Sequence, residues 1–306
     1  MPQISEFAEK VSRWILGTVY KGLYGSVEKS MQGLFDSLDH EIVSATQLIS
    51  AGPKQWNGSA FNLVQAVAEN VCIPIAAAFI TVIFCWELIH LVQESNNMNA
   101  VKPEKIFLVL LKFGLCLMVC AYSFKIVMGF CDVGIWSAQR MRSGNNISFA
   151  SVSNSMTLAD LGLEPDPDVY TDLIQLLGQL LELVGYQIML VLAKFGDWIC
   201  GVVVYVRVMI WFVEFLIYAS AAPIPYSTWV NKEWSQVGMN YTRKMLALSF
   251  DGFFILLLFA IYGGVLGGLR LGDFKESLVM ILGCGFGLAV MMFKAGNISA
   301  SIFNAH

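Results

Sequence analysis

The strongest constraint on the fold of this chain is a series of apolar segments that are long enough to cross a lipid bilayer. A helical span needs about 17 to 25 mostly apolar residues. Four segments meet this length, at residues 71–92, 106–131, 245–269 and 277–293, and a fifth apolar stretch at 173–223 is longer than any of them. The sequence therefore predicts a protein that crosses the membrane several times.

The composition leads to the same fold class. Of the 306 residues, 57% are hydrophobic and 14% are charged, whereas soluble domains carry about 25% charged residues. A soluble core of this size could not hide so much apolar surface. Because alternating strand patterns are weak, we expect an all-α, polytopic transmembrane helical bundle rather than a barrel. The net charge of −4 also argues against a nucleic-acid-binding protein.

The stretch at 173–223 is too long for one straight span, because a helix rises about 1.5 Å per residue. Its main interruption is the polar group at 194–197. We expect either two spans, or one crossing and a half-helix or re-entrant segment. Lys and Arg concentrate in cytoplasmic loops, and a cytoplasmic loop at 224–244 requires an odd number of crossings. This favours about five spans and one half-helix, and six spans remain the alternative.

Residues 1–70 precede the first predicted span and show a helical apolar period. Apolar residues recur at steps of three or four from Phe7 to Ile49, with charged residues between them. This pattern predicts an amphipathic helical region that is split near Gly17–Gly25 or at Gly33. Its mixed charge favours contact with a protein over binding to the membrane surface.

The distribution of charged residues among the loops predicts the orientation in the membrane. The loops at 93–105 and 224–244 carry Lys and Arg and are expected to be cytoplasmic, which makes the N-terminus external. The expected organisation is an external amphipathic region at 1–70, a first transmembrane hairpin at 71–131, an external polar loop at 132–172, a central apolar stretch with the C-terminal spans at 173–295, and a cytoplasmic tail at 296–306.

Several polar side chains fall within the apolar segments, where each is unfavourable unless it faces protein or water. Gln175, Gln179 and Glu182 share one helical stripe. Arg207 and Glu214 lie on one face but about 10 Å apart along a helix, so we expect each to pair with another helix. Two interpretations stay open, a hydrated lumen and helix pairing. Three further charged side chains lie within the predicted spans: Lys112, Lys125 and Asp251.

A glycine-rich segment predicts close helix packing. Glycines four residues apart let two helix backbones approach closely. The contact is either within one chain or between the subunits of a homo-oligomer. The glycines concerned are Gly263, Gly264, Gly267, Gly268 and Gly272.

Motifs of common enzyme classes are missing from the sequence. It contains no GxxxxGK[ST] phosphate loop and no HExxH, GxSxG or GxGxxG motif. The seven cysteines include no CxxC pair and have no zinc-site spacing. We therefore expect no enzymatic activity, no metal and no cofactor, with bound phospholipid as the non-protein component.

The most distinctive block of the sequence begins near residue 219. It reads ASAAPIPYST at 219–228, NKEW at 231–234, and LALSFDGF at 246–253. The two prolines end the preceding helix. The block resembles that of the TrbL-type polytopic membrane proteins of conjugative type IV secretion systems, in the branch found in Gram-positive elements. The residues that carry the likeness are Pro223, Pro225, Glu233, Trp234 and Arg243.

The resemblance implies a membrane channel or platform subunit that oligomerises and helps to pass a DNA–relaxase substrate across the cytoplasmic membrane. It implies as partners further copies of the chain, other membrane subunits of the machine, and separate secretion ATPases that dock on the loops at 93–105 and 224–244. A secondary transporter or small-solute channel remains the alternative, because a helix broken at Pro223 also suits a transporter.

Overall fold

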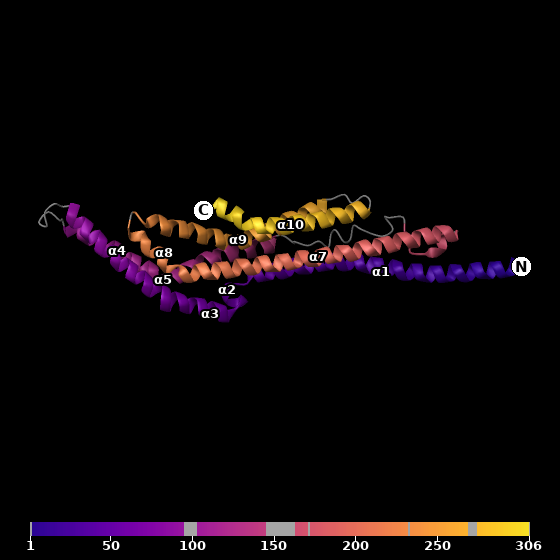
Figure 1. Cartoon of the computed structure of the whole chain (residues 1–306), viewed down its shortest axis with the longest axis horizontal. Helices are drawn as coiled ribbons and strands as arrows, with labels where there is room; N and C mark the ends of the chain where they lie inside the picture. Colours follow the sequence, from indigo (N-terminus) through magenta and orange to yellow (C-terminus); the bar gives the residue numbers. More distant parts are fainter. Residues whose placement is uncertain are drawn as a thin grey trace. The chain divides into compact units, whose positions relative to one another are not determined.

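The computed structural model describes residues 2–94, 103–144, 163–170, 172–231, 233–268 and 274–305. This part of the chain is helical and contains no strand (Figure 1), which confirms the predicted all-α class. The chain divides into two compact units. Unit 1 comprises Met1–Ala45, Asn146–Tyr205 and Leu258–Val290, and unit 2 comprises Thr46–Asn145, Val206–Leu257 and Met291–His306.

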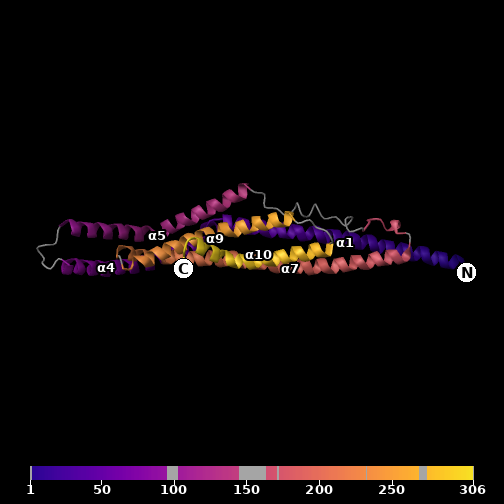
Figure 2. The ribbon, with the colours of Figure 1, turned by 90° about the horizontal axis from the view of Figure 1, so that it is seen from above.

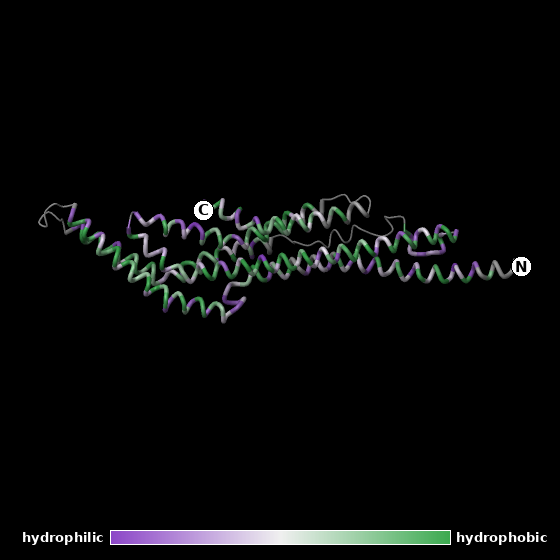
Figure 3. Tube along the Cα trace, in the orientation of Figure 1, coloured by the Kyte–Doolittle hydropathy of each residue, from purple (hydrophilic) through white to green (hydrophobic). Residues whose placement is uncertain are grey.

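Five of the described segments are long and apolar enough to cross a membrane. Large apolar side chains such as Val82, Phe107 and Ile188 are exposed along them, and Figure 3 shows mostly apolar residues along the first of these helices. This pattern is expected of helices whose outer surface faces acyl chains. The segments are Gly58–Gln93, Glu104–Met141, Leu173–Val230, Ser235–Tyr262 and Gly283–Ile302.

The first helix, α1 (Pro2–Ser50), is continuous, so the predicted split near Gly17–Gly25 or at Gly33 is wrong. No proline lies beyond its first residue, and a glycine inside a helix costs only about 1 kcal/mol. Two of the glycines also have packing roles in unit 1. A Cβ at Gly17 would lie 3.4 Å from Pro167, and a Cβ at Gly33 would lie 3.4 Å from the ammonium of Lys194.

The apolar face of α1 is buried only in part. Val27, Met31 and Leu34 are buried within unit 1, as the amphipathic pattern predicted. Further toward the N-terminus, Phe7 and Trp14 are at least 70% exposed. The apolar face therefore continues beyond the part of the chain that covers it.

The segment that precedes α7 (Leu173–Ala221) is fastened to α1 within unit 1. The Tyr20 hydroxyl donates a hydrogen bond to the carbonyl oxygen of Glu164 (2.9 Å), and Arg13 donates to the carbonyl oxygen of Tyr170 (2.7 Å). Burial raises the pKa of Tyr20 above its usual value, so the hydroxyl stays a donor. Lys21 and Asp166 add an exposed ion pair of 3.4 Å.

In unit 2, the first predicted span begins earlier than the sequence indicated. After α2 (Pro53–Trp56), helix α3 (Gly58–Val67) continues through the π-turn η1 (Ala68–Cys72) into α4 (Ile73–Glu94). The side chain of Asn57 caps α3 by accepting from the amide of Ala60. Pro74 explains the π-turn, since its ring has no N–H for the preceding turn, and the Ile73 amide bonds instead to Ala68 five residues back.

Helix α5 (Pro103–Gly144) packs beside α4 as an antiparallel hairpin (Figure 2). The rings of Phe84 and Phe113 pack edge to face, with 4.7 Å between the ring centroids. Buried residues of both helices, among them Ile80 and Phe124, belong to the apolar core of unit 2. Residues 132–144, which were assigned to an external loop, are helical, because Ile135 and Ala138 keep the apolar period and are buried.

Helix α7 runs without a break for 49 residues, so the polar group at 194–197 interrupts the apolar stretch but not the helix. Charged side chains do not break backbone hydrogen bonds, and Asp197 is itself buried in unit 1. An α-helix of this length spans about 74 Å, against a hydrocarbon core of about 30 Å. Residues 173–221 therefore form one continuous helix, without the separate half-helix that was expected.

Four helical elements follow α7 along the chain. The short turns α8 (Pro223–Ser227) and η5 (Thr228–Val230) lead into α9 (Ser235–Gly268), and α10 (Phe274–Ile302) follows. Helix α10 extends into residues 296–302, where a cytoplasmic tail was predicted. Ser299 explains this extension, since its buried hydroxyl donates to the carbonyl oxygen of Ala247 on α9 (2.5 Å).

We predict that Gly134→Ala destabilises unit 2. The added Cβ would overlap the carbonyl oxygen of Ser249 and lie 2.8 Å from its carbonyl carbon, so α5 and α9 would have to separate. The expected loss is about 1–3 kcal/mol, measured as a lower melting temperature in detergent. Gly129→Ala on the same helix is the control, because its Cβ meets nothing within 4 Å. Equal melting of Gly134→Ala and wild type would contradict the close approach.

Candidate functional site

The polar centre of unit 2 is a buried ion pair between two membrane-spanning segments. Arg207 of α7 donates through its terminal nitrogen to the carboxylate of Asp251 on α9, at 2.5 Å. Its Nε donates to the carbonyl oxygen of Met292 on α10, at 3.0 Å. Arg207 is 5% exposed and Asp251 is 1% exposed. One guanidinium therefore joins three helices.

The same two helices continue this pairing toward the end of α7. The indole of Trp211 donates to the carbonyl oxygen of Leu248 (2.7 Å), and Glu214 pairs with Lys244 (3.4 Å). One turn further, the hydroxyl of Tyr241 donates to the carbonyl oxygen of Tyr218 (2.7 Å). We call these contacts, with the Arg207–Asp251 pair, the α7–α9 polar ladder.

The ladder confirms that Arg207 and Glu214 pair with another helix and not with each other. Lys244, the partner of Glu214, was placed in a loop by the sequence and was not recognised as a partner. A signal was present, since Lys244 and Asp251 repeat the seven-residue spacing of Arg207 and Glu214 with the charges in the matching antiparallel order.

Gly296 of α10 makes room for the ion pair. A Cβ at this position would lie 3.0 Å from the guanidinium of Arg207. A cavity of about 250 Å³ lies beside the pair and is lined by both ion pairs of the ladder and by Asn297. A water molecule takes about 30 Å³, so the cavity has room for several. Among the described residues, Oδ1 of Asp251 has no hydrogen-bond partner.

The predicted stripe on the first part of α7 lies in unit 1, apart in sequence from the ladder. Gln175 and Glu182 are exposed, and Gln179 is partly buried with its Oε1 unpaired among the described residues. Tyr186, which continues the stripe, is buried. Of the other charged residues predicted within spans, Lys112 and Lys125 are exposed on α5.

The glycine-rich segment is described only in part. Gly264 of α9 is exposed, and a Cβ there would meet nothing within 4 Å. Of Gly263, Gly267 and Gly268 only the helical backbone is described, and Gly272 lies outside the described residues. On α10, Gly283 and Gly287 also have open space around them. Gly264, Gly283 and Gly287 therefore do not pack against the described part of their own chain.

The proline turn docks on α5 through two thiols. Cys120 donates to the carbonyl oxygen of Pro223 (3.5 Å), and Cys116 donates to that of Tyr226 (3.4 Å). These two contacts join α8 to α5. The seven cysteines form no disulfide in the described structure, which also contains no group of His, Cys, Asp or Glu that could hold a metal ion.

The other residues of the turn block lie in α8, in the turn that follows it, or in the first part of α9. Pro225 lies in α8, and its carbonyl accepts from Thr228. A Cβ at Gly238 would overlap the ring of Trp229, which explains a glycine at this point of α9. Glu233 and Trp234 are exposed on the turn, and Arg243 is partly buried on α9.

These features define a multi-pass helical membrane protein whose spans are joined by buried polar contacts. Comparison with protein families gives a match to the model described as TrbL/VirB6 plasmid conjugal transfer like protein, over residues 38–223. The match covers more than half of the chain, which therefore belongs to this family and is a subunit of a conjugal transfer, or type IV secretion, system. Comparison with curated proteins and with solved structures gives no match.

The matched range differs from the part of the sequence on which the resemblance was based. It ends at Pro223, so the other four residues that carry the likeness lie beyond it: Pro225, Glu233, Trp234 and Arg243. It includes α3, α4, α5 and all of α7. It therefore contains the ladder residues of α7: Arg207, Trp211, Glu214 and Tyr218. The family is confirmed, while the family role of the turn block stays a prediction.

We predict that Asp251→Asn is strongly destabilising, because it leaves the buried guanidinium of Arg207 without its counterion. Breaking a buried pair from one side costs about 3–5 kcal/mol, seen as lower yield and a lower melting temperature in detergent. Glu214→Gln is the control, since this pair is about one-third exposed and should contribute less than about 1 kcal/mol. The double variant Arg207→Met, Asp251→Leu should recover most of the loss. Equal melting of Asp251→Asn and Glu214→Gln would contradict the assignment.

Proposed function

We propose that this chain is a channel or platform subunit of a conjugative type IV secretion system, and that several copies assemble to help a DNA–relaxase substrate cross the cytoplasmic membrane. Family membership is the observation that carries the proposal. The subunit has no enzymatic role in this proposal. Separate ATPases dock on the cytoplasmic loops, and the orientation follows the Lys and Arg distribution, with an external N-terminus.

The surface of α7 supports an assembly with a hydrated interior. Along the first turns of this helix, Ile174 is 85% exposed and Leu181 is 66% exposed. Gln175 and Glu182 are exposed among these apolar side chains. A carboxylate is unfavourable against acyl chains. In the proposed assembly this stripe faces a partly hydrated space shared between copies.

The glycines without contacts among the described residues support the same assembly. Gly264, Gly283 and Gly287 are exposed on helices that are long and apolar, or continue into such helices. In lipid, small residues at this spacing let the backbones of two helices pack closely. A helix of a second copy would pack against these glycines.

We predict that Glu182→Gln keeps the assembly intact and lowers DNA transfer. A side chain that faces a hydrated space can lose its charge without leaving a partner unpaired. If Glu182 instead belonged to a buried ion pair, the substitution would destabilise the protein by about 3–5 kcal/mol. Assembly is measured by light scattering in detergent, and transfer by mating with the variant as the sole copy. Loss of assembly would contradict the proposal that this stripe faces a hydrated space.

Cysteine labelling gives a second measurement of the stripe in a cysteine-free background. A water-soluble thiol reagent should modify cysteines at 175 and 182 and leave Leu177→Cys unmodified, although Leu177 is 48% exposed in the single chain. Control cysteines at 155 and 236 report sidedness, since the reagent added outside should reach only 155. Equal protection at all stripe positions would contradict the hydrated space, and external labelling of 236 would contradict the orientation.

We predict that Gly283→Leu and Gly287→Leu reduce the size of the assembly. A leucine at either position meets open space in its own chain, so a lower mass in detergent would result from lost contacts with another copy. Gly114→Leu on α5 is the matched control, because this helical glycine also has open space around it. Unchanged mass in both α10 variants would contradict the proposed packing.

A further inference from the structure

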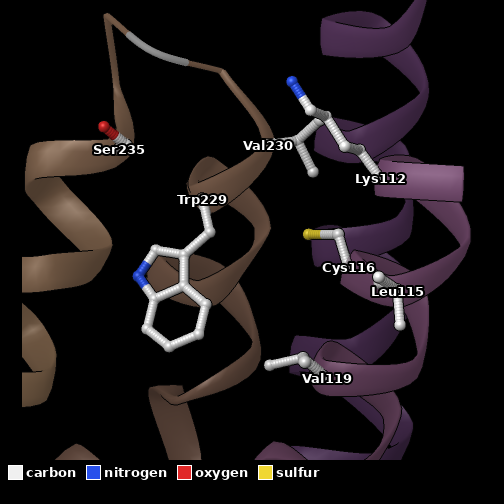
Figure 4. Close-up of a pocket in the computed structure, with 7 residues that line it drawn as sticks. All are labelled: Lys112, Leu115, Cys116, Val119, Trp229, Val230 and Ser235. Atoms are coloured by element: carbon white, nitrogen blue, oxygen red, sulfur yellow. The ribbon is translucent and has the colours of Figure 1, made fainter. Parts of the chain in front are cut away.

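A pocket of about 360 Å³ lies in unit 2 between α5 and the turn that leads into α9 (Figure 4). On the α5 side it is lined by Lys112, Leu115, Cys116 and Val119. On the other side lie Trp229 and Val230 of η5, with Ser235 at the first turn of α9. The pocket is separate from the cavity beside the polar ladder, with which it shares no lining residue.

The two ends of this pocket differ in polarity. In Figure 4, the ammonium of Lys112 lies at one end, near Val230, and Val119 lies at the other end, with Trp229 on the opposite wall. Lys112 and Val119 are two turns apart on α5, or about 10 Å. A ligand that fills the pocket therefore needs an anionic end and an apolar end.

Lys112 has no ion-pair partner among the described residues. It follows the exposed apolar residues Leu108, Leu110 and Leu111 on a helix that is long and apolar enough to cross a membrane. An ammonium in such a position is stabilised when its head reaches the interface or an anion. The charge of the pocket is thus complementary to a phosphate group.

We propose that this pocket binds one anionic glycerophospholipid. The phosphodiester lies at the ammonium of Lys112, and one acyl chain lies along Leu115, Val119 and the indole of Trp229. A lipid is favoured over a free phosphate because the larger part of the pocket wall is apolar. The α5 helix also exposes Leu115 and Met118 beside the pocket, which gives an acyl chain a continuous apolar path.

Trp229 allows a direct test, because bromine atoms on an acyl chain quench the fluorescence of a nearby indole. The protein is reconstituted in phosphatidylcholine vesicles that contain brominated phosphatidylglycerol or brominated phosphatidylcholine. The contribution of Trp229 is the difference between the protein and its Trp229→Phe variant. We expect half-maximal quenching of Trp229 at about fivefold lower mole fraction of the anionic lipid, the preference expected for one lysine beside a lipid phosphate.

Lys112→Gln should abolish this preference. Lys112 is exposed, so this variant is expected to fold, as checked by its melting temperature. Lys125→Gln is the matched control, because Lys125 is an exposed lysine of the same helix, lies over the ring of Tyr122 at 5.3 Å and does not line the pocket. The control should keep the preference of the wild type.

Three outcomes would overturn the proposal. The first is equal quenching by the two brominated lipids, which would show contact with bulk lipid only. The second is a preference that Lys112→Gln retains. The third is displacement of the anionic lipid by millimolar inorganic phosphate, which would show an anion site that does not require an acyl chain. Retention of phosphatidylglycerol by wild type, and its loss from Lys112→Gln in native mass spectrometry, would support the proposal independently.

Discussion

The arrangement of helices in unit 2 depends on the ion pair between Arg207 and Asp251. Both side chains are buried in segments that are apolar enough to cross a membrane, where an unpaired charge is strongly unfavourable. The pair sets the register between α7 and α9, because a shift by one turn would separate the charges. Through Met292, it also holds the last part of α10. Gly296 admits the guanidinium where a side chain would crowd it.

Helix length imposes a second constraint on this protein. Helix α7 is more than twice as long as a hydrocarbon core is thick, and α1 has the same number of residues without being apolar enough to span. Much of the helical structure therefore lies outside the hydrocarbon. In unit 1 this part is fastened to the segment before α7 by contacts of Tyr20 and Arg13.

The proline turn joins α7 to α9. Its prolines end α7, and its carbonyls are satisfied by the thiols of α5. Gly238 lets α9 start directly against Trp229. The same turn forms one wall of the pocket at Lys112. Pro223 and Pro225, two residues of the family-like motif, thus have a structural reason for their identity.

The sequence by itself determined the all-α membrane class, the approximate positions of the apolar segments, and the separate pairing of Arg207 and Glu214, because these follow from hydropathy and helical period. Only the tertiary structure decided that α1 and α7 are continuous. Glycines and charged residues lower the stability of a helix without breaking it, and packing contacts offset this loss of stability. It also decided that Asp251, 44 residues away, is the partner of Arg207. Such pairing depends on which helices are neighbours and in what register, and local spacing does not contain that information.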